Sequence, residues 1–513
     1  MSTKLSYGQT LALVAKKFPD KDAFICGDKR YTFKQFDERC NRLANGLLEL
    51  GVLKGDNVAT LFVSRIEIFE NYYGITKMGA VVVPLNFRLA PGEYITVLNH
   101  SNAQVLIYEE MYQQLVDAIR PKLPGIKHYI KVGSNDDESV NYDDLISNAL
   151  PDEPKVDIDG SDNAFILYTA GTTGTPKGVV RTHENQLLGA VNFVALPVTC
   201  FGPDAILLSC PPAFHCATQE VAHSIMMLGG TNILLPLYKG FDPAEVLKTV
   251  QQEKATGLWM VPTMWMATLA YPEIGKFDLS SLKLASNGGA IMPLAMKQKI
   301  IKLFPNAELM DFFGMTEMNP WTCILTGDDA LRKPDSVGKP VTTVDIRIWD
   351  DQCHDVPRGE VGEIVYSGPS VMKEYHRDPQ QTSAAMKGGY FHTGDLVRQD
   401  EEGFVYVVDR KKDMIISGGE NIYPAEVEMI LSKNPKIESV AVIGIPDAKW
   451  GESVKAVVKL REGQSATQEE IMEYCKNDIA RYKAPRSIDF VTEFPESSTG
   501  KVLKRELREK YSK

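Results

Sequence analysis

A segment rich in glycine and threonine carries the first chemical signal of this sequence. After the apolar run 164–167, the ten residues from Thr169 to Gly178 include three glycines, four threonines and one lysine. Glycines let backbone N–H groups approach an anion closely, the hydroxyl groups donate hydrogen bonds, and the lysine adds a positive charge. The composition predicts a polyphosphate-binding loop formed by Thr169, Gly171, Thr172, Thr173, Gly174, Thr175 and Lys177.

This loop differs from the common nucleotide-binding P-loop. In a P-loop the lysine is followed by serine or threonine at the start of a helix. Here Gly178 follows Lys177, and Pro176 with Gly178 opposes the immediate start of a helix. By composition alone, an ordinary surface turn fits the segment equally well.

The second motif is D-F-F-G-M-T-E, from Asp311 to Glu317. An aromatic residue followed by glycine can stack on a purine while the base lies against the backbone. Glu317 supplies a carboxylate oxygen of the kind that Mg²⁺ binds. The alternative is a buried strand end followed by a solvated glutamate.

The third motif is Y-F-H-T-G-D, from Tyr390 to Asp395. An aspartate after a glycine turn can accept hydrogen bonds from both hydroxyls of a ribose. Gly-Asp is also a common turn pair, so the motif alone is weak.

The fourth motif is S-T-G-K, from Ser498 to Lys501, followed by a basic helix. A lysine on a loop with a glycine can reach into a closed site as a point charge. A solvated basic tail is the alternative.

Together these motifs resemble those of the adenylate-forming superfamily, which includes acyl- and aryl-CoA synthetases, peptide-synthetase adenylation domains and beetle luciferases. The string from Leu167 to Val180 resembles the phosphate-binding signature of that superfamily, and the other three follow in family order across nearly the whole chain. Ala170 stands where most members carry serine, which removes one hydroxyl ligand. We therefore expect a retuned nucleotide affinity.

The resemblance implies the roles of the site residues. Lys501 would bridge the carboxylate and the phosphate during adenylation, and Thr169, Lys177 and Glu317 would be catalytic with it. Glu317 and Thr172 would bind magnesium, Phe313 would stack on adenine, and Asp395 would bind ribose. The remaining ATP- and AMP-binding residues that the resemblance implies are Gly288, Gly289, Ala290, Asp311, Phe312, Gly314, Met315, Thr316 and Arg410.

The implied reaction has two steps. A carboxylate attacks the α-phosphorus of ATP, which gives an acyl-AMP and pyrophosphate, and coenzyme A then displaces AMP. A C-terminal lid would rotate about a hinge at Lys412 between the steps. The segment from Ser417 to Glu428 looks most like that of the CoA ligases. The implied CoA-binding residues are Ser417, Gly418, Gly419, Trp450, Lys483 and Arg486.

The acyl pocket is expected to be lined by Phe214, His215, Met264, Gly314, Met318 and Trp321. Acetate-specific relatives carry tryptophan where this chain has Gly314, so acetate is not the expected substrate. Methionines offer a flexible apolar lining, which favours a medium- to long-chain fatty acid, while aryl and cyclic acids remain open. Two other functions remain alternatives: a luciferase-like oxygenase, and an adenylation enzyme that loads a carrier protein.

Strands that alternate with helices predict an α/β fold with helix-covered, mostly parallel sheets. Thr32 and Gln35 form a capping box at the start of a predicted helix over 32–51. Further strands are expected over 58–63, 80–84 and 104–108, and 135–162 is expected to be a surface connection. A small β-rich subdomain is expected over 344–408. We expect a large N-terminal domain over 1–411 and a small mobile α+β lid domain over 412–513.

Composition sets further limits. A chain of 513 residues is long enough for two or more domains. A net charge of −11 argues against a nucleic-acid partner, so the expected partners are a small carboxylic acid, ATP and CoA, with a homodimer left open. Eight scattered cysteines indicate reduced thiols. Neither a transmembrane segment nor a signal peptide is recognisable, and the expected location is the cytoplasm.

Overall fold

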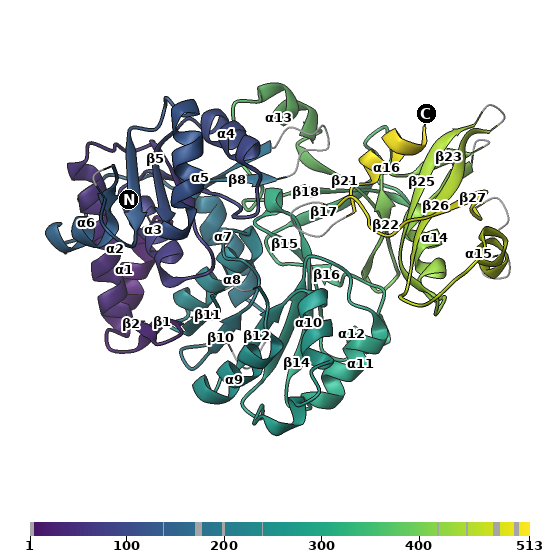
Figure 1. Ribbon diagram of the computed structural model, residues 1–513, viewed down its shortest axis with the longest axis horizontal. Helices are drawn as coiled ribbons and strands as arrows, with labels where there is room; N and C mark the ends of the chain where they lie inside the picture. Colours follow the sequence, from purple (N-terminus) through teal and green to yellow (C-terminus); the bar gives the residue numbers. More distant parts are fainter. Residues whose placement is uncertain are drawn as a thin grey trace. The chain divides into compact units, whose positions relative to one another are not determined.

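The computed structural model describes every residue except 1–4, 137, 170–176, 197–200, 237, 239, 418–419, 448–449, 476–482, 497–501 and 513. The chain divides into two compact units (Figure 1). The first comprises Met1–Asp345 and Tyr366–Phe391, and the second comprises Ile346–Val365 and His392–Lys513. The boundary of a mobile lid at Lys412 stays a prediction.

The first unit contains an eight-stranded sheet with the order β19-β9-β8-β4-β3-β5-β6-β7. Its middle strands are parallel, whereas β9 runs antiparallel to both of its neighbours. The strands are β3 (Asn57–Leu61), β4 (Val81–Pro84), β5 (Ala103–Glu109), β6 (His128–Val132), β7 (Val140–Asn141), β8 (Asn163–Thr169), β9 (Lys177–Thr182) and β19 (Glu374–Tyr375).

A nine-stranded sheet completes the first unit, with the order β16-β15-β14-β13-β12-β10-β11-β1-β2. Its central strands, from β14 to β1, are parallel. The strands are β1 (Asp22–Cys26), β2 (Lys29–Thr32), β10 (Ile206–Ser209), β11 (Thr231–Leu234), β12 (Gly257–Met260), β13 (Leu284–Gly288), β14 (Glu308–Gly314), β15 (Trp321–Thr326) and β16 (Lys339–Pro340).

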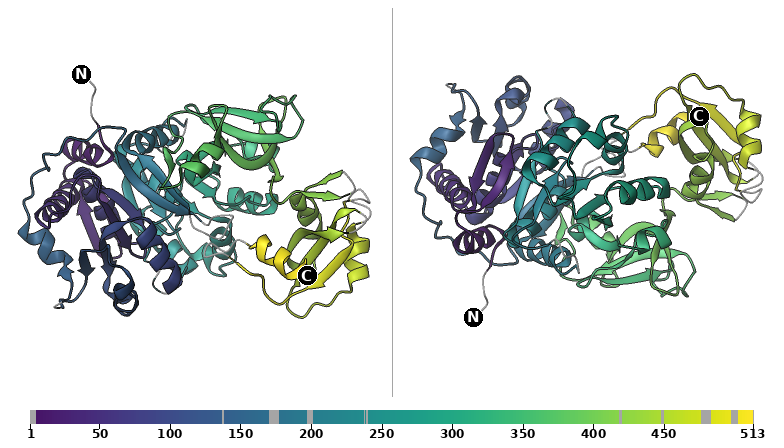
Figure 2. Two further views of the ribbon diagram at one scale, coloured as in Figure 1. Left: turned by 90° about the horizontal axis from the view of Figure 1, so that it is seen from above. Right: turned by 90° about the horizontal axis from the view of Figure 1, so that it is seen from below.

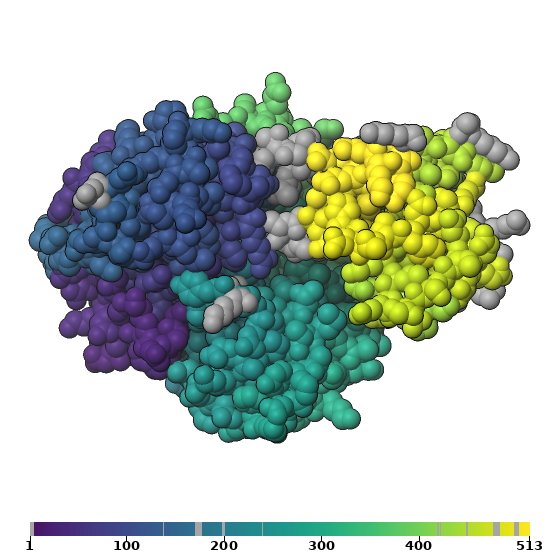
Figure 3. Space-filling view, in the orientation of Figure 1, coloured from purple at the N-terminus to yellow at the C-terminus, as the bar shows by residue number. Residues whose placement is uncertain are grey.

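Helices cover both faces of the eight-stranded sheet. Alternate strand residues such as Val58 and Ala59 belong to separate apolar clusters on opposite faces. In the space-filling view, residues of the purple-to-blue N-terminal segment lie together on the face that is shown (Figure 3). The helices of the first unit are α1 (Tyr7–Lys17), α2 (Phe33–Glu49), α3 (Ile66–Lys77), α4 (Pro91–His100), α5 (Gln113–Ile119), α6 (Tyr142–Asn148), α7 (His183–Val194), α8 (Cys216–Met227), α9 (Pro243–Glu253), α10 (Pro262–Leu269), α11 (Leu294–Leu303), α12 (Asp329–Arg332) and α13 (Pro379–Ala385).

The largest apolar core of the first unit joins the two sheets through helices. This core contains Phe165 of the eight-stranded sheet, Phe24 of the nine-stranded sheet, and aromatic side chains of α1, α2 and α3. Every residue of α3 is buried, as expected for a helix that is enclosed by protein on all sides. These two joined sheets form the scaffold on which the first two motifs lie.

The second unit contains most of a five-stranded sheet and a second sheet with the order β24-β23-β26-β25, where β27 pairs with β26. Figure 2 shows helix α16, in yellow, beside the strands of this second sheet in both views. The strands of these two sheets are β17 (Asp345–Trp349), β18 (Gly362–Ser367), β20 (Met386–Lys387), β21 (Tyr390–Gln399), β22 (Val405–Arg410), β23 (Ile415–Ser417), β24 (Glu420–Ile422), β25 (Ile437–Asp447), β26 (Gly451–Leu460) and β27 (Ser487–Phe490). Of these, β20 belongs to the first unit. The helices are α14 (Pro424–Leu431), α15 (Gln468–Cys475) and α16 (Lys504–Tyr511).

The predicted α/β architecture with mostly parallel sheets is confirmed, and so is the capping box of α2. Thr32 accepts from the backbone N–H of Gln35, and the Gln35 side chain accepts from the N–H of Thr32. The interpretation of 135–162 as a surface connection was wrong in part, because β7 and α6 lie within it. Tyr142 and Ile146 of α6 are buried. Asp143 and Asp144 lie in the first turn of α6, where acidic residues favour a helix N-terminus.

Across the part of the chain that the structure describes, none of the helices is both long and apolar enough to cross a membrane.

Candidate active site

The first motif lies at the end of a β-hairpin-like strand pair. Strands β8 and β9 are antiparallel, and their last pair is Thr169 with Lys177. These two candidate residues therefore mark the two ends of the predicted phosphate loop. The loop residues between them, Gly171, Thr172, Thr173, Gly174 and Thr175, lie outside the described residues.

Tyr375 connects two of the predicted catalytic residues. Strand β19 pairs with β9, which places Tyr375 opposite Val179. The ammonium group of Lys177 lies 4.9 Å from the centre of the Tyr375 ring, and the Tyr375 hydroxyl donates a hydrogen bond of 3.1 Å to Glu317 Oε1. The structure thus brings Lys177 and Glu317 to the same tyrosine, which the sequence analysis missed because an isolated tyrosine carries no chemical signal.

Glu317 lies in the short 3₁₀ turn η4 (Thr316–Met318) and is 8% exposed. The backbone N–H of Met372 donates to its carbonyl oxygen at 2.7 Å. Arg181, a second residue that the sequence analysis missed, donates to the carbonyl oxygen of Thr316. The turn that carries the predicted metal ligand is therefore fixed by contacts from distant parts of the chain.

The residues present fit a magnesium ion held jointly with a nucleotide. In the described ranges, no group of three or more His, Cys, Asp or Glu side chains is placed to hold a metal. Mg²⁺ in nucleotide sites commonly takes one or two protein carboxylates, with phosphate and water oxygens as the other ligands. Glu317 can fill that protein position. The other predicted ligand, Thr172, is not among the described residues.

The second motif and the turn at Gly288–Ala290 lie side by side. Strands β13 and β14 are parallel, with Asn287 opposite Asp311 and Gly288 opposite Phe312. Gly289 has a φ of +84°, in the left-handed region that favours glycine. Ligands of open α/β sheets bind beyond the carboxyl ends of parallel strands, and both predicted nucleotide segments lie at such ends.

The side chains of the second motif differ in their surroundings. Phe312 is buried, 4.7 Å from Trp321 between ring centres, whereas Phe313 is only partly buried. Asp311 forms an ion pair of 2.6 Å with the buried Lys297. Burial raises the pKa of Asp311, and Lys297 opposes that rise. Phe313 therefore has the accessible ring that adenine stacking requires, while Phe312 and Asp311 hold the strand end in place.

Of the predicted acyl-pocket residues, Trp321 belongs to an aromatic cluster with Trp259 and Phe312. Trp321 is 2% exposed and contacts Trp259 at 5.5 Å between ring centres. Met318 is fully buried, Met264 on α10 is partly buried, and Phe214 lies against His215 at 4.1 Å between ring centres.

Gly314 has a tighter environment than the sequence suggested. A Cβ at this position would lie 1.6 Å from the carbonyl oxygen of Pro320, in a region where the pairing of β14 with β15 is irregular. A tryptophan here would require the Pro320 backbone to move. A Gly314→Trp variant would therefore report on this backbone as well as on pocket length.

The third motif lies on strand β21, which pairs with β22. Asp395 of β21 is paired in register with Arg410 of β22, and their side chains form an ion pair. The hydroxyl of Thr393 accepts from the N–H of Asp395 at 2.9 Å, and Gly394 has a φ of +72°. The structure thus places the two predicted nucleotide-contacting residues of the second unit together.

Only some of the predicted CoA-binding residues lie together. The guanidinium of Arg486 lies 4.5 Å from the centre of the Trp450 ring, whereas Lys483 donates to both oxygens of Glu426 at 2.8 Å. Ser417, at the end of β23, is buried. Gly418, Gly419 and Lys501 lie outside the described residues.

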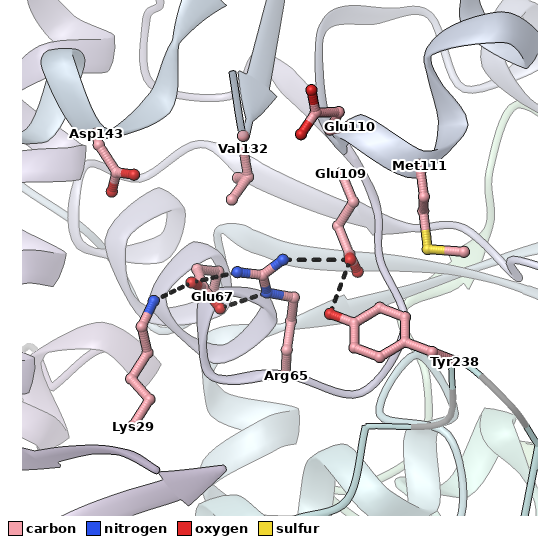
Figure 4. Close-up of a pocket in the computed structure, with 10 residues that line it drawn as sticks. Lys29, Arg65, Glu67, Glu109, Glu110, Met111, Val132, Asp143 and Tyr238 are labelled. Carbon is pink, nitrogen blue, oxygen red and sulfur yellow. Dashed lines mark hydrogen bonds and ion pairs between the residues drawn. The ribbon is translucent and has the colours of Figure 1, made fainter. Parts of the chain in front are cut away.

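A pocket of about 360 Å³ lies elsewhere in the first unit (Figure 4). Four of its charged groups, Lys29, Arg65, Glu67 and Glu109, are joined by ion pairs. Arg65 donates to Glu67 Oε2 at 2.6 Å and to Glu109 Oε2 at 3.2 Å, and Lys29 donates to Glu67 Oε1 at 2.7 Å. Tyr238 also donates to Glu109. None of these residues belongs to the four motifs, and we interpret the pairs as a structural network.

Arg65→Met is expected to lower the free energy of unfolding at neutral pH by about 3–5 kcal/mol, because Glu67 and Glu109 would be left buried without their main partner. Urea unfolding measures this loss. Arg505→Met is the control, since the Arg505–Glu509 pair is at least half exposed and such pairs contribute about 0–1 kcal/mol. Equal losses in both variants would contradict the structural role of Arg65.

The pH dependence of this loss follows from Glu67. Burial alone would raise its pKa, but Arg65 and then Lys29 lower it to about 2. The stabilisation by Glu67 is therefore complete above its unfolded pKa of about 4.3 and is lost as the pH falls through about 2. The difference between wild type and Arg65→Met should shrink over that range, as measured by urea unfolding at several pH values. A constant difference would contradict the assignment to Glu67.

Comparison with known proteins agrees with this geometry. The AMP-binding enzyme family matches residues 11–376, and the AMP-binding enzyme C-terminal domain matches residues 426–501. Among curated relatives, the long-chain-fatty-acid–CoA ligase FadD13 of Mycobacterium tuberculosis is 38% identical over 490 residues, which are 94% of each chain. The feruloyl-CoA synthase of Amycolatopsis sp. is 38% identical over 499 residues, 97% of each chain.

A solved structure gives the same result for the fold. The anthranilate CoA ligase AuaEII, in complex with anthranoyl-AMP, has a TM-score of 0.89 and 27% identity, with 100% of this chain and 98% of that chain covered. This chain belongs to the AMP-binding enzyme family. The resemblance to the adenylate-forming superfamily is thereby confirmed.

Proposed function

We propose that this protein is an ATP-dependent carboxylic acid–CoA ligase whose substrate is a medium- to long-chain fatty acid. Its enzyme class follows from the family and from relatives along almost the whole chain: it is an AMP-forming acyl-CoA synthetase. The observation that supports the site assignment best is the placement of Lys177 and Glu317 against the same tyrosine, at the end of the strand pair that carries the phosphate signature.

The first half-reaction brings two anions together, so positioning and charge neutralisation dominate its catalysis. Lys177 begins β9, and its ammonium group would neutralise phosphate oxygens at the end of the strand pair. Glu317 would hold magnesium, which when bound supplies positive charge to the phosphates. Lys501 would bring further positive charge to the reacting carboxylate and α-phosphate.

Phe313, Asp395 and Arg410 would bind the nucleoside. Phe313 offers its partly buried ring to adenine. Asp395, with Arg410 beside it, offers carboxylate oxygens to the ribose hydroxyls. In the second half-reaction the thiol of CoA attacks the acyl carbon, and AMP leaves with the carboxylate oxygen that had bonded to phosphorus.

The choice of acid rests on the pocket residues. The buried Met318 and the partly buried Met264 are unbranched and adaptable, which favours an aliphatic chain. The aromatic cluster of Phe312, Trp259 and Trp321 is the observation that favours an aryl acid instead. The fatty-acid and feruloyl relatives have the same identity to this chain and do not distinguish the two kinds of acid. Our choice of a fatty acid therefore rests on the methionines of the pocket.

A substrate panel tests the proposal. The purified protein is mixed with ATP, magnesium, CoA and one acid at a time, and AMP and pyrophosphate are measured. We expect octanoate and longer fatty acids to have the highest kcat/KM, and acetate to have a kcat/KM lower by orders of magnitude. Feruloyl-type acids as the best substrates would replace the fatty-acid assignment. Formation of AMP and pyrophosphate without consumption of CoA would favour the oxygenase or the carrier-loading enzyme.

We also propose a cytoplasmic location. The seven described cysteines are all free, which is typical of proteins in a reducing compartment.

A further inference from the structure

The turn that carries Glu317 has an unusual backbone. It ends at Asn319, whose φ of +58° lies in the left-handed region. Few residues other than glycine adopt that conformation, and asparagine is among those that do. The contacts that fix this turn identify which residues set the position of Glu317.

Arg181 fixes the turn from one side. It lies four positions after Lys177 on β9 and is fully buried. Its Nε donates to the carbonyl oxygen of Thr316 at 2.9 Å, and Nη2 donates to the same oxygen. Its Nη1 donates to Asn319 Oδ1 and, at 3.0 Å, to Gln186 Oε1. One guanidinium group thus holds both ends of the turn.

Helix α7 supports the same turn. Asn319 Nδ2 donates to the carbonyl oxygen of Asn185 at 2.5 Å. Asn319 can approach α7 this closely because Gly189 has no side chain. A Cβ at Gly189 would lie 1.9 Å from Asn319 Nδ2. The turn is therefore held against β9 and α7 with little freedom to shift.

Tyr375 fixes the carboxylate itself from the other side. Its hydroxyl donates to Glu317 Oε1, and its ring lies against the ammonium group of Lys177. The backbone N–H of Tyr375 donates to Thr382 Oγ1 at 3.0 Å, which anchors the residue. A hydrogen bond to one carboxylate oxygen sets the direction in which the other oxygen is presented.

We propose that Arg181 and Tyr375 are positioning residues that fix the Glu317 carboxylate beside Lys177 and thereby set the affinity for the metal–nucleotide complex. This proposal rests on the proposed function, which gives Glu317 its role as a metal ligand. Hydrogen-bond partners that orient a metal ligand typically change metal affinity by about 10–100-fold when they are removed. Tyr375 acts on the carboxylate, and Arg181 acts through the backbone of the turn.

A purely structural role is the competing explanation. The positive charge of a buried guanidinium must be balanced by neighbouring polar or negative groups. Burial lowers the pKa of Arg181, while Cys216, Glu220 and Glu317 oppose that shift. Glu220 is fully buried, and neither of its oxygens has a hydrogen-bond partner among the described residues. Arg181 would then serve only the packing between α7, α8 and β9, and its loss would lower stability without a specific effect on the metal.

The test uses the full chain and the variants Tyr375→Phe and Arg181→Lys. Mn²⁺ replaces Mg²⁺, and its binding in the presence of a nonhydrolysable ATP analogue is measured by electron paramagnetic resonance. Binding of the analogue without metal is measured by calorimetry. We expect each variant to bind Mn²⁺ about tenfold more weakly, with metal-free binding of the analogue unchanged. Lysine keeps the charge of Arg181 but not its forked donor geometry.

Arg39→Lys is the matched control for a structural arginine. Arg39 donates to the fully buried Glu70 at 2.5 and 3.1 Å in the same unit, so this variant should lower the melting temperature and leave Mn²⁺ binding unchanged. If Arg181→Lys does not fold, Tyr375→Phe decides the result.

Wild-type Mn²⁺ affinity in Tyr375→Phe would overturn the proposal. Equal losses with and without metal would also overturn it, because the residues would then act on the fold or on the phosphates. A wild-type protein that binds the analogue without any effect of Mn²⁺ would instead refute the magnesium role of Glu317, and the proposal with it.

Discussion

Lys501→Ala is expected to lower the rate of acyl-AMP formation by about a hundredfold to a thousandfold, the effect typical of removing one preorganised group that stabilises developing charge. The same variant should form the thioester from supplied acyl-AMP and CoA at close to the wild-type rate. The charge of the Lys501 side chain is required only in the first half-reaction, where two anions, the carboxylate and ATP, meet. Pyrophosphate exchange measures the first half-reaction, and acyl-CoA formation from synthetic acyl-AMP measures the second.

The control for this variant is Lys510→Ala. Lys510 is exposed on the basic helix α16, so its removal should change neither half-reaction. If Lys501→Ala fails equally in both half-reactions, Lys501 serves the fold and not the chemistry. If it behaves like Lys510→Ala, the segment is a solvated basic tail.

Lys412→Pro is expected to have the opposite effect: near-normal adenylation with loss of thioester formation. Lys412 is the third residue of a turn in which the N–H of Asp413 donates to the carbonyl oxygen of Arg410 at 2.8 Å. Proline fixes φ and restricts the preceding residue, so it should prevent the backbone rotation that a hinge requires. The same two assays of the half-reactions measure the effect.

Lys412→Ala separates the backbone from the side chain at this position. Alanine removes the side chain without restricting φ, and both half-reactions should continue. Equal losses of both half-reactions in Lys412→Pro would indicate general misfolding or a hinge at another position. A thioester defect in the alanine variant as well would assign the effect to the lysine side chain.

Local signals in the sequence predicted much of the fold. The capping box at Thr32 and the alternation of strands with helices are set by neighbouring residues, and both are found in the structure. Helix α6 was missed because it has only seven residues, and its acidic first turn resembles a surface loop. Its buried Tyr142 hydroxyl donates to Glu70, 72 positions away in sequence, a contact that no local pattern reveals.

Part of the candidate site could likewise be predicted from the sequence. Each of the four motifs is a short continuous segment, and each could be recognised from its residue types and from the family resemblance. The residues that hold Glu317 could not be recognised in this way, because they are far from it in sequence. Tyr375 lies 58 positions from Glu317, and Arg181 lies 135 positions from Thr316. The steric limit at Gly314 depends on the path of the Pro320 backbone, which residue types alone do not determine.

Transfer of heavy oxygen from the acid to AMP is the most direct test of the central claim, that this enzyme activates its acid as an acyl-AMP. A fatty acid with a heavy-oxygen carboxylate is incubated with the enzyme, ATP, magnesium and CoA, and AMP is analysed by mass spectrometry. We predict one heavy oxygen in each AMP, because the attacking carboxylate oxygen stays on phosphorus when CoA displaces AMP. Label found only in inorganic phosphate, or unlabelled AMP formed together with acyl-CoA, would contradict the acyl-AMP pathway.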